Sequence, residues 1–510
     1  MKKNPMKFCL AAVLVALTLA GQEANAQGFG KNLLNKAKSA VTSGNSSTSS
    51  SSSTSTPSSS SSNTAANTQS SSATSSSASN SGVVYYVSAA GNARANGLSP
   101  EAPMKDLQKA LNKIKENKED GAIVKVAEGN YLGYMNAGYI EISNFITLEG
   151  GYSADFKQRD PLKYITRIEP THEQDGTNGH KGLITLAAMD DVMATQPKGT
   201  LIIDGLMLNL GLQNAYKPND PSDPRNGCPS KNFETGRMED ATPPQIQHQI
   251  IKGDAAVCGN VIIRNCLIAN STYFGIQFNS RRGEIEIYNC VIISNRYGGV
   301  RIDGYDKKGE GTHINFHHNT VAFSWCRDKA MEDMGYGYEF MNRCNADLHH
   351  NIFLCNNYSA IARTRIDSEK ALEAKKKTNV TNNIFFMNAA DIQLPSKGGG
   401  KWTNVKVANF EDLDETTFPE IDGNIELKSG DSFIDSIDPD YLQGFASLKV
   451  VSSSSFDPNS AANLYRQAHG MNMQGSETIR VSMYGNRYNF DKALKFFGAK
   501  EGFGAQKFNK

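Results

Sequence analysis

Ile263-Arg-Asn-Cys-Leu-Ile268 is the first of five related phrases that return along the middle of this 510-residue chain. The other four are Ile287-Tyr-Asn-Cys-Val-Ile292, Phe316-His-His-Asn-Thr-Val321, Leu348-His-His-Asn-Ile-Phe353 and Val380-Thr-Asn-Asn-Ile-Phe385. Aligned on their fourth residue, successive copies lie 24, 29, 32 and 32 residues apart. A period of roughly 20–45 residues is typical of a solenoid, in which each repeat covers the apolar face of its neighbour.

The residue types within each repeat indicate the kind of solenoid. Each phrase has two short runs rich in β-branched or aromatic residues, separated by a polar corner. A third run follows, as in Gly275-Ile-Gln-Phe-Asn279, Gly299-Val-Arg-Ile-Asp303 and Gly337-Tyr-Glu-Phe-Met341. Because no repeat shows helical periodicity, several short strands per repeat predict a parallel β-helix.

Equivalent residues of successive coils should stack about 4.8 Å apart, so that like polar side chains form ladders. The first predicted ladder contains Asn265, Asn289, His318, His350 and Asn382, and the second contains Cys266, Cys290, Asn319, Asn351 and Asn383. Stacking would bring Cys266 and Cys290 within reach of a disulfide. Both cysteines also suit a buried column as small apolar side chains, which is the interpretation we favour.

These phrases, with Tyr85-Tyr-Val-Ser88 and Gly97-Leu-Ser-Pro100 near the start, resemble the right-handed parallel β-helix, or pectin-lyase-like, superfamily. The resemblance covers roughly residues 83–440 and suggests a bacterial exported β-helix repeat protein. It implies an all-β fold: a right-handed parallel β-helix solenoid with an N-terminal capping helix and short C-terminal helices. Members include polysaccharide lyases, hydrolases and epimerases, and also surface proteins without catalysis, so the fold does not settle the function.

Residues 1–26 have the features of a signal peptide. Three lysines precede the apolar run from Phe8 to Ala20, and Ala24-Asn-Ala26 matches a cleavage site. The run is shorter than the roughly 20 apolar residues that a transmembrane helix needs, and no later stretch approaches that length. We therefore expect a secreted, periplasmic or cell-surface protein without a membrane span.

Three further regions follow from composition. Residues 27–82 are dominated by serine and predict a disordered linker, apart from a short amphipathic helix at 31–41. Residues 83–440 form the predicted β-helix, in which a helix from Pro103 to Lys118 caps the first coil. Residues 441–510 are predicted to close the other end with short helices at 460–470 and 489–497.

The charge balance limits the partners. Removal of residues 1–26 leaves 50 basic and 51 acidic residues, a net charge near −1. A protein that binds polyanions usually has a basic surplus. We therefore expect no nucleic acid partner, and we expect a monomer that binds a polysaccharide or other glycan.

Strand alternation predicts which side chains leave the solenoid. If Ile276, Val300 and Tyr338 face the core, then Gln277, Arg301 and Glu339 form one exposed column. Asn279 and Asp303 lie in the next column. Candidate binding residues are Gln277, Asn279, Trp325, Arg327, Arg363 and Arg365, of which Trp325 and Arg327 lie in an insertion at 324–336 and the last two rim the same face.

Arg301, Asp303 and Glu339 are the candidate catalytic residues on this face. In enzymes of the superfamily, the substrate lies along an outward sheet face, where Arg or Lys takes a proton and carboxylates or Ca²⁺ neutralise the sugar acid. Arg301 can act as a base only with a strongly depressed pKa. A hydrolase instead needs two carboxylates roughly 5–9.5 Å apart, for which Asp303 and Glu339 are the nearest pair. The alternative is a solvated charge ladder without catalysis.

The histidines do not predict a metal site. His313, His317 and His349 fall on outward positions, and His318 and His350 belong to the first ladder. The sequence places no third ligand beside them. We therefore predict no metal centre and no cofactor, with Ca²⁺ as the one ion left open by the resemblance.

Two functions remain. The chain is either a non-catalytic surface protein that binds carbohydrate, or a polysaccharide lyase or glycoside hydrolase that uses the outward face. No segment matches a lyase or hydrolase motif. We favour carbohydrate binding, and the sequence leaves open whether the protein is an enzyme.

Overall fold

The computed structural model describes most of the chain beyond residue 81. The described residues are 82–133, 139–170, 182–211, 230–231, 238–239, 248–304, 312–324, 335–340, 344–356, 359–363, 377–388, 390–395, 402–427, 431, 433, 437, 458 and 488–508. The chain divides into Met1–Ser77 and Ala78–Lys510, and every described residue belongs to the second unit. The predicted signal peptide, the serine-rich linker and the helix at 460–470 lie outside the described residues. Among those described, no helix is both long and apolar enough to cross a membrane.

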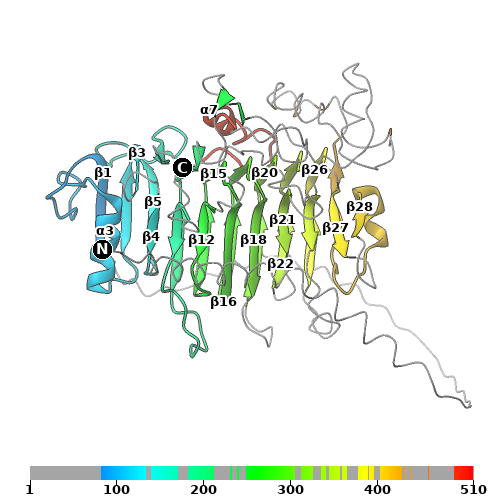
Figure 1. Ribbon diagram of the computed structural model, residues 1–510, viewed down its shortest axis with the longest axis horizontal. Helices are drawn as coiled ribbons and strands as arrows, with labels where there is room; N and C mark the ends of the chain where they lie inside the picture. The colour runs from blue at the N-terminus through cyan, green and yellow to red at the C-terminus, as the bar shows by residue number, and fades with distance from the viewer. Residues whose placement is uncertain are drawn as a thin grey trace, which may run out of the picture. The chain divides into compact units, whose positions relative to one another are not determined.

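Three sheets of parallel strands form the β-helix, as predicted (Figure 1). Sheet A contains β1 (Val84–Asn92), β2 (Ile123–Ala127), β5 (Thr147–Tyr152), β8 (Thr200–Asp204), β14 (Asn260–Arg264), the end of β16 (Phe274–Tyr288), β19 (Thr312–His317), β22 (Asn345–His349) and β25 (Thr378–Thr381). Sheet B contains β3 (Gly129–Tyr131), β6 (Thr166–Ile168), β9 (Met207–Asn209), β15 (Leu267–Ala269), β17 (Val291–Ile293), β20 (Thr320–Ala322), β23 (Ile352–Leu354), β26 (Ile384–Phe386) and β29 (Ile425–Glu426).

Sheet C contains β4 (Ile140–Ile142), β7 (Ile184–Leu186), β12 (Ile251–Gly253), β13 (Val257–Cys258), the start of β16, β18 (Gly298–Gly304), β21 (Tyr336–Phe340), β24 (Ser359–Arg363), β27 (Ile392–Pro395) and β28 (Trp402–Val405). Strand β16 runs from sheet C into sheet A and makes them continuous. Antiparallel pairing occurs between β27 and β28, and between β10 (Ser230–Lys231) and β11 (Met238–Glu239).

The repeats seen in the sequence are the coils of the solenoid. Each of the five phrases supplies the end of a sheet A strand, a corner and a sheet B strand. The first position of the sheet B strands runs in register through Leu267, Val291, Thr320, Ile352 and Ile384. The alignment that predicted the coils is therefore the register of the strands.

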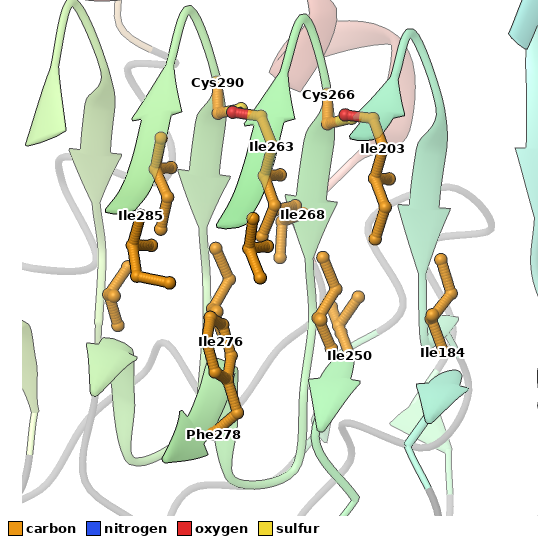
Figure 2. Packing of buried hydrophobic residues seen from close by; sticks show 14 of the residues in the cluster. Ile184, Ile203, Ile250, Ile263, Cys266, Ile268, Ile276, Phe278, Ile285 and Cys290 are labelled. Carbon is orange, nitrogen blue, oxygen red and sulfur yellow. The ribbon is translucent and has the colours of Figure 1, made fainter. Parts of the chain in front are cut away.

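The core is a set of apolar columns (Figure 2). One of these columns contains Ile263, Ile287, Phe316, Leu348 and Val380, all with no exposed surface. Burying such a side chain contributes about 1.5–3 kcal/mol. Cys266 and Cys290 are buried free thiols in this core, as we favoured. Their Sγ atoms lie 3.9 Å from Ile203 O and 3.7 Å from Ile263 O.

The corner between sheets A and B forms both predicted ladders. Asn265, Asn289, His318, His350 and Asn382 all have φ between 52° and 55°. Asparagine adopts this left-handed conformation more readily than most residues. At the next position, Asn351 Oδ1 accepts from Asn319 N at 2.9 Å, and Asn383 Oδ1 accepts from Asn351 N at 3.0 Å. Each asparagine thus satisfies the backbone of the coil beside it.

The corner between sheets B and C holds a further ladder, which the sequence analysis missed. Its left-handed residues are Asn270, Ser294, Phe323, Cys355 and Met387. At the following position, Asn356 Oδ1 accepts from Ser324 N at 3.2 Å, and Asn388 Oδ1 accepts from Asn356 N at 3.0 Å. The sequence contains a pattern that could have predicted this ladder, because Asn356 and Asn388 follow Asn351 and Asn383 by five residues.

Helix α3 (Leu107–Asn117) covers the first coil with Leu107, Ala110, Leu111 and Ile114, the face that the sequence predicted. The Asp106 side chain accepts a hydrogen bond from Lys109 N and caps the helix. The helix begins later than the predicted Pro103, because Met104 forms backbone bridges with Val87 and Asn92 of β1.

The C-terminal segment differs from its prediction. Helix α7 (Phe490–Leu494) is shorter than the predicted 489–497 and lies beside the middle coils (Figure 1). Asn270 Oδ1 accepts from Tyr488 N at 2.8 Å, and Thr320 Oγ1 accepts from Ala505 N at 3.0 Å. Residues 488–508 therefore pack along sheet B instead of covering the last coil. Helical periodicity predicted a helix but not the surface against which it packs. At the last coils the structure has β28 and the 3₁₀ helix η5 (Val407–Asp412).

Candidate functional site

The outer face of sheet C brings together the residues that the alternation pattern singled out. Gln277 pairs in register with Arg301, and Arg301 pairs with Glu339. Asn279 and Asp303 pair in the neighbouring column. We call the full outward column the sheet C column; it contains Glu141, Thr185, Lys252, Gln277, Arg301, Glu339, Ala362 and Gln393.

Arg301 and Glu339 form an ion pair at the centre of this column. Arg301 Nε lies 3.6 Å from Glu339 Oε2, and their side chains are only 15% and 4% exposed. The prediction that Glu339 is an exposed residue was therefore wrong, and Gln277 and Arg301 are half-buried. Alternation determines the side of a strand from which a residue projects, but not what packs over it. Asn279 is exposed, as expected.

The electrostatics of Arg301 keep it protonated. Burial by itself lowers its pKa, but the charge of Glu339, with smaller effects of Tyr273, Tyr297 and Asp303, raises the pKa above its ordinary value. A guanidinium in this state cannot accept a proton from a substrate. It can still donate several hydrogen bonds from a fixed planar group.

Two tyrosines beside Arg301 complete the site, and the sequence analysis missed both. The ring centroids of Tyr273 and Tyr297 lie 4.6 Å apart, and both side chains are half-buried. Phe274 packs against Tyr297 at 4.8 Å, and the Arg301 guanidinium lies 5.7 Å from the Phe274 ring. The repeat could have predicted that the two tyrosines stack in neighbouring coils, because they are 24 residues apart, like Cys266 and Cys290.

Polar groups continue on the N-terminal side of Arg301. Gln277 Oε1 accepts a hydrogen bond of 2.9 Å from Gln249 Nε2, and Gln249 is buried. One coil further, Lys252 Nζ donates to Asp254 Oδ1 at 3.0 Å. Side-chain amides, an arginine and paired charges therefore line the face. Such groups suit a ligand with many hydroxyl groups.

The two candidate carboxylates share one counter-ion. Asp303 lies two residues beyond Arg301 on β18, and Glu339 lies opposite Arg301 on β21. Both raise the pKa of the arginine. Both carboxylates balance the positive charge of Arg301, which agrees with the charge-ladder alternative of the sequence analysis.

Arg363 does not rim this face. Ala362 holds the sheet C column on β24, whereas Arg363 is buried and pairs in register with Phe340. Its Nη1 donates to Thr417 Oγ1 at 3.4 Å, and burial lowers the pKa of the guanidinium. Arg363 therefore belongs to the packing between β24 and the residues after η5. Trp325, Arg327 and Arg365 lie outside the described residues.

The histidines occupy a different face, on sheet A. The rings of His317 and His349 stack at 4.9 Å, and those of His318 and His350 at 5.0 Å. His313 lies between two carboxylates, with Nδ1 3.0 Å from Glu284 and Nε2 2.8 Å from Asp347. Within the described part of the chain, no group of three or more His, Cys, Asp or Glu side chains is placed to hold a metal ion.

A comparison with solved structures found similar chains. The crystal structure of pectate lyase Pel9A matches at 14% sequence identity and a TM-score of 0.31, over 63% of this chain and 72% of that chain. No family model matches the chain, and no curated protein matches it. The parallel β-helix is established by the strand pairings, and the function has to be argued from the site.

Proposed function

We propose that this chain binds a neutral polysaccharide along the outer face of sheet C, without chemically altering it. The export signal predicted at residues 1–26 would place this binding outside the cytoplasm. The observation that carries the proposal is Arg301, which pairs with the carboxylate of Glu339 and interacts electrostatically with Tyr273 and Tyr297.

The tyrosines supply what a sugar ring needs. A sugar has apolar C–H faces and polar hydroxyl edges, and tyrosine combines a flat apolar ring with a hydroxyl group. Tyr273 and Tyr297 stand at equivalent positions of consecutive coils with their rings tilted by 55°, so they offer apolar ring surface along the direction in which a chain would lie. Arg301 and Gln277 supply hydrogen-bonding groups on the same sheet.

Charge favours a neutral glycan over an acidic one. The charge of Arg301 interacts with two carboxylates, those of Asp303 and Glu339. Lys252 forms an ion pair with Asp254. The face therefore has no surplus positive charge with which to attract a uronic acid polymer. The near-zero charge of the whole chain agrees with this.

The enzyme alternative is less well supported. A lyase would need a neutral base, whereas the pKa of Arg301 is raised. A hydrolase would need one carboxyl as acid and a second as base or nucleophile. Here Asp303 and Glu339 both act as counter-ions of Arg301.

Affinity electrophoresis of purified protein tests the proposal. Xyloglucan, galactomannan or mixed-linkage β-glucan should retard the protein, whereas polygalacturonate and alginate should not. Tyr297→Ala should weaken retardation about tenfold. Tyr164→Ala, a half-buried tyrosine outside sheet C, is the matched control and should bind normally. A preference for the acidic polymers, or equal binding by both variants, would contradict the proposal. Release of unsaturated products or new reducing ends would instead support the enzyme.

A further inference from the structure

A pocket of about 210 Å³ lies at the end of sheet C where the solenoid begins. It is lined by Gln108, Asn112, Tyr139, Ile140, Glu141, Thr185 and Asp254. Pockets for drug-sized ligands are larger, roughly 300–1,000 Å³. The size of this pocket suits a single sugar ring.

The pocket is part of the same column as Arg301. Glu141 pairs in register with Thr185, which pairs with Lys252, and Lys252 pairs with Gln277. Gln277 then pairs with Arg301. Four steps of about 4.8 Å put the pocket roughly 19 Å from Arg301 along the sheet. An extended ligand on this face would therefore reach both.

Helix α3 closes the column at the pocket. Gln108 Nε2 donates to Glu141 O at 3.2 Å, and Gln108 Oε1 accepts from Glu141 N at 2.8 Å. The glutamine side chain thus takes the position that a further strand would have beside β4. Lys115 adds an ion pair of 2.9 Å to the Glu141 carboxylate. The described residues leave no continuation of the outer face beyond α3.

The chemistry of the pocket matches that of the column. Amide, hydroxyl, carboxylate and phenol groups surround it, and these donate and accept hydrogen bonds to hydroxyl groups. Both carboxylates have a lysine partner, Lys115 for Glu141 and Lys252 for Asp254. The pocket therefore suits an uncharged polar ligand.

From this arrangement we infer that the pocket binds the terminal sugar of a neutral glycan, whose following residues lie along the sheet C column toward Arg301. The protein then recognises chain ends and not chain interiors, because α3 blocks a chain from passing through. This inference rests on the proposed function and adds the part of the polymer that is bound.

The inference is tested by measuring how binding depends on the number of glycan chain ends. Each neutral glycan that retards the protein is immobilised at constant mass, before and after limited endo-hydrolysis that multiplies its ends but leaves long chains. The amount of protein bound at saturation should rise in proportion to the number of ends. If the amount stays constant, the inference is overturned while the proposed function stands. If no neutral glycan binds at all, both fail.

A pocket-filling variant provides the second measurement. Asn112 is exposed on α3, so Asn112→Trp should fill the pocket without disturbing the core. It should lower affinity for the hydrolysed glycan about tenfold and abolish the dependence on chain ends. Lys109→Trp, an exposed position of the same helix that does not line the pocket, is the matched control. Normal end-dependent binding by Asn112→Trp would overturn the inference.

Discussion

The interior ladder at Asn319, Asn351 and Asn383 and the sheet C column at Gln277, Arg301 and Glu339 are built on the same repeat, yet their side chains do different things. Each ladder asparagine is fully buried and bonds to an identical residue in the next coil. In the sheet C column no residue is followed by its own kind. The repeated asparagines of the ladder join one coil to the next, and we propose that the varied side chains of the sheet C column contribute to ligand binding.

The histidine columns on sheet A extend this comparison. They face outward like the sheet C column, but they repeat and stack like the ladder. His317 also stacks on Tyr288 at 5.0 Å, and His349 Nε2 donates to Asn315 Oδ1 at 3.1 Å. The stacked rings come from neighbouring coils, so these histidines contribute to the contacts between the coils.

The largest expected effect on stability comes from a substitution in the asparagine ladder. Asn351→Ala removes the acceptor of Asn319 N and the donor to Phe316 O, both buried. We expect the free energy of unfolding to fall by about 1–3 kcal/mol. Urea denaturation measures this. Asn279→Ala, at an exposed position of the sheet C face, should be near neutral. Equal midpoints for the two variants would contradict the distinction between ladder and face.

The histidine columns should make stability depend on pH. Burial first, and then the neighbouring imidazoles, lower the pKa of both His317 and His349 to about 4. The unfolded chain, with a histidine pKa near 6.5, binds more protons between these values. The free energy of unfolding should therefore fall as pH drops from about 6.5 to 4, by about 1–2 kcal/mol given partial solvent screening.

A double variant isolates this effect. His317→Tyr with His349→Thr places in the column the residues that it already has at Tyr288 and Thr381. Melting temperatures measured from pH 7 to pH 4 should then change less than in the original protein. An unchanged pH profile would show that the stacked histidines are not the cause.

A smaller effect on stability is expected at the ion pair of the sheet C column. Glu339→Gln leaves the Arg301 charge without its closest acidic partner in a buried setting. We expect a loss of about 1 kcal/mol in urea denaturation, together with weaker glycan binding.

The smallest effect on stability is expected for Arg301→Lys. The charge opposite Glu339 is kept, so the melting temperature should hardly change. The planar fork of donors is lost, and glycan affinity should fall about tenfold in affinity electrophoresis. If affinity is unchanged while stability falls, Arg301 belongs with the ladder and not with a binding site.

Much of the fold could be predicted from the sequence, because each repeat consists of residues that are close together in the chain. The spacing of Cys266, Cys290, Asn319, Asn351 and Asn383 gave the coils and their register. Asparagine at the first corner agreed with the left-handed backbone found there. At the second corner Phe323, Cys355 and Met387 adopt the same conformation, which nothing in their chemistry favours. There the closed geometry of the coil imposes the conformation.

The sequence by itself determined the parallel β-helix, the face of α3 that covers it and the registry of Gln277, Arg301 and Glu339. These depend on periodicity, which the chain carries residue by residue. Only the tertiary structure decided that Glu339 is buried, that Tyr273 and Tyr297 stand beside Arg301, and that Gln108 closes the edge of sheet C. It also placed residues 488–508 along sheet B. Such contacts join residues that are distant in sequence, so burial and neighbours emerge only when the coils have been stacked.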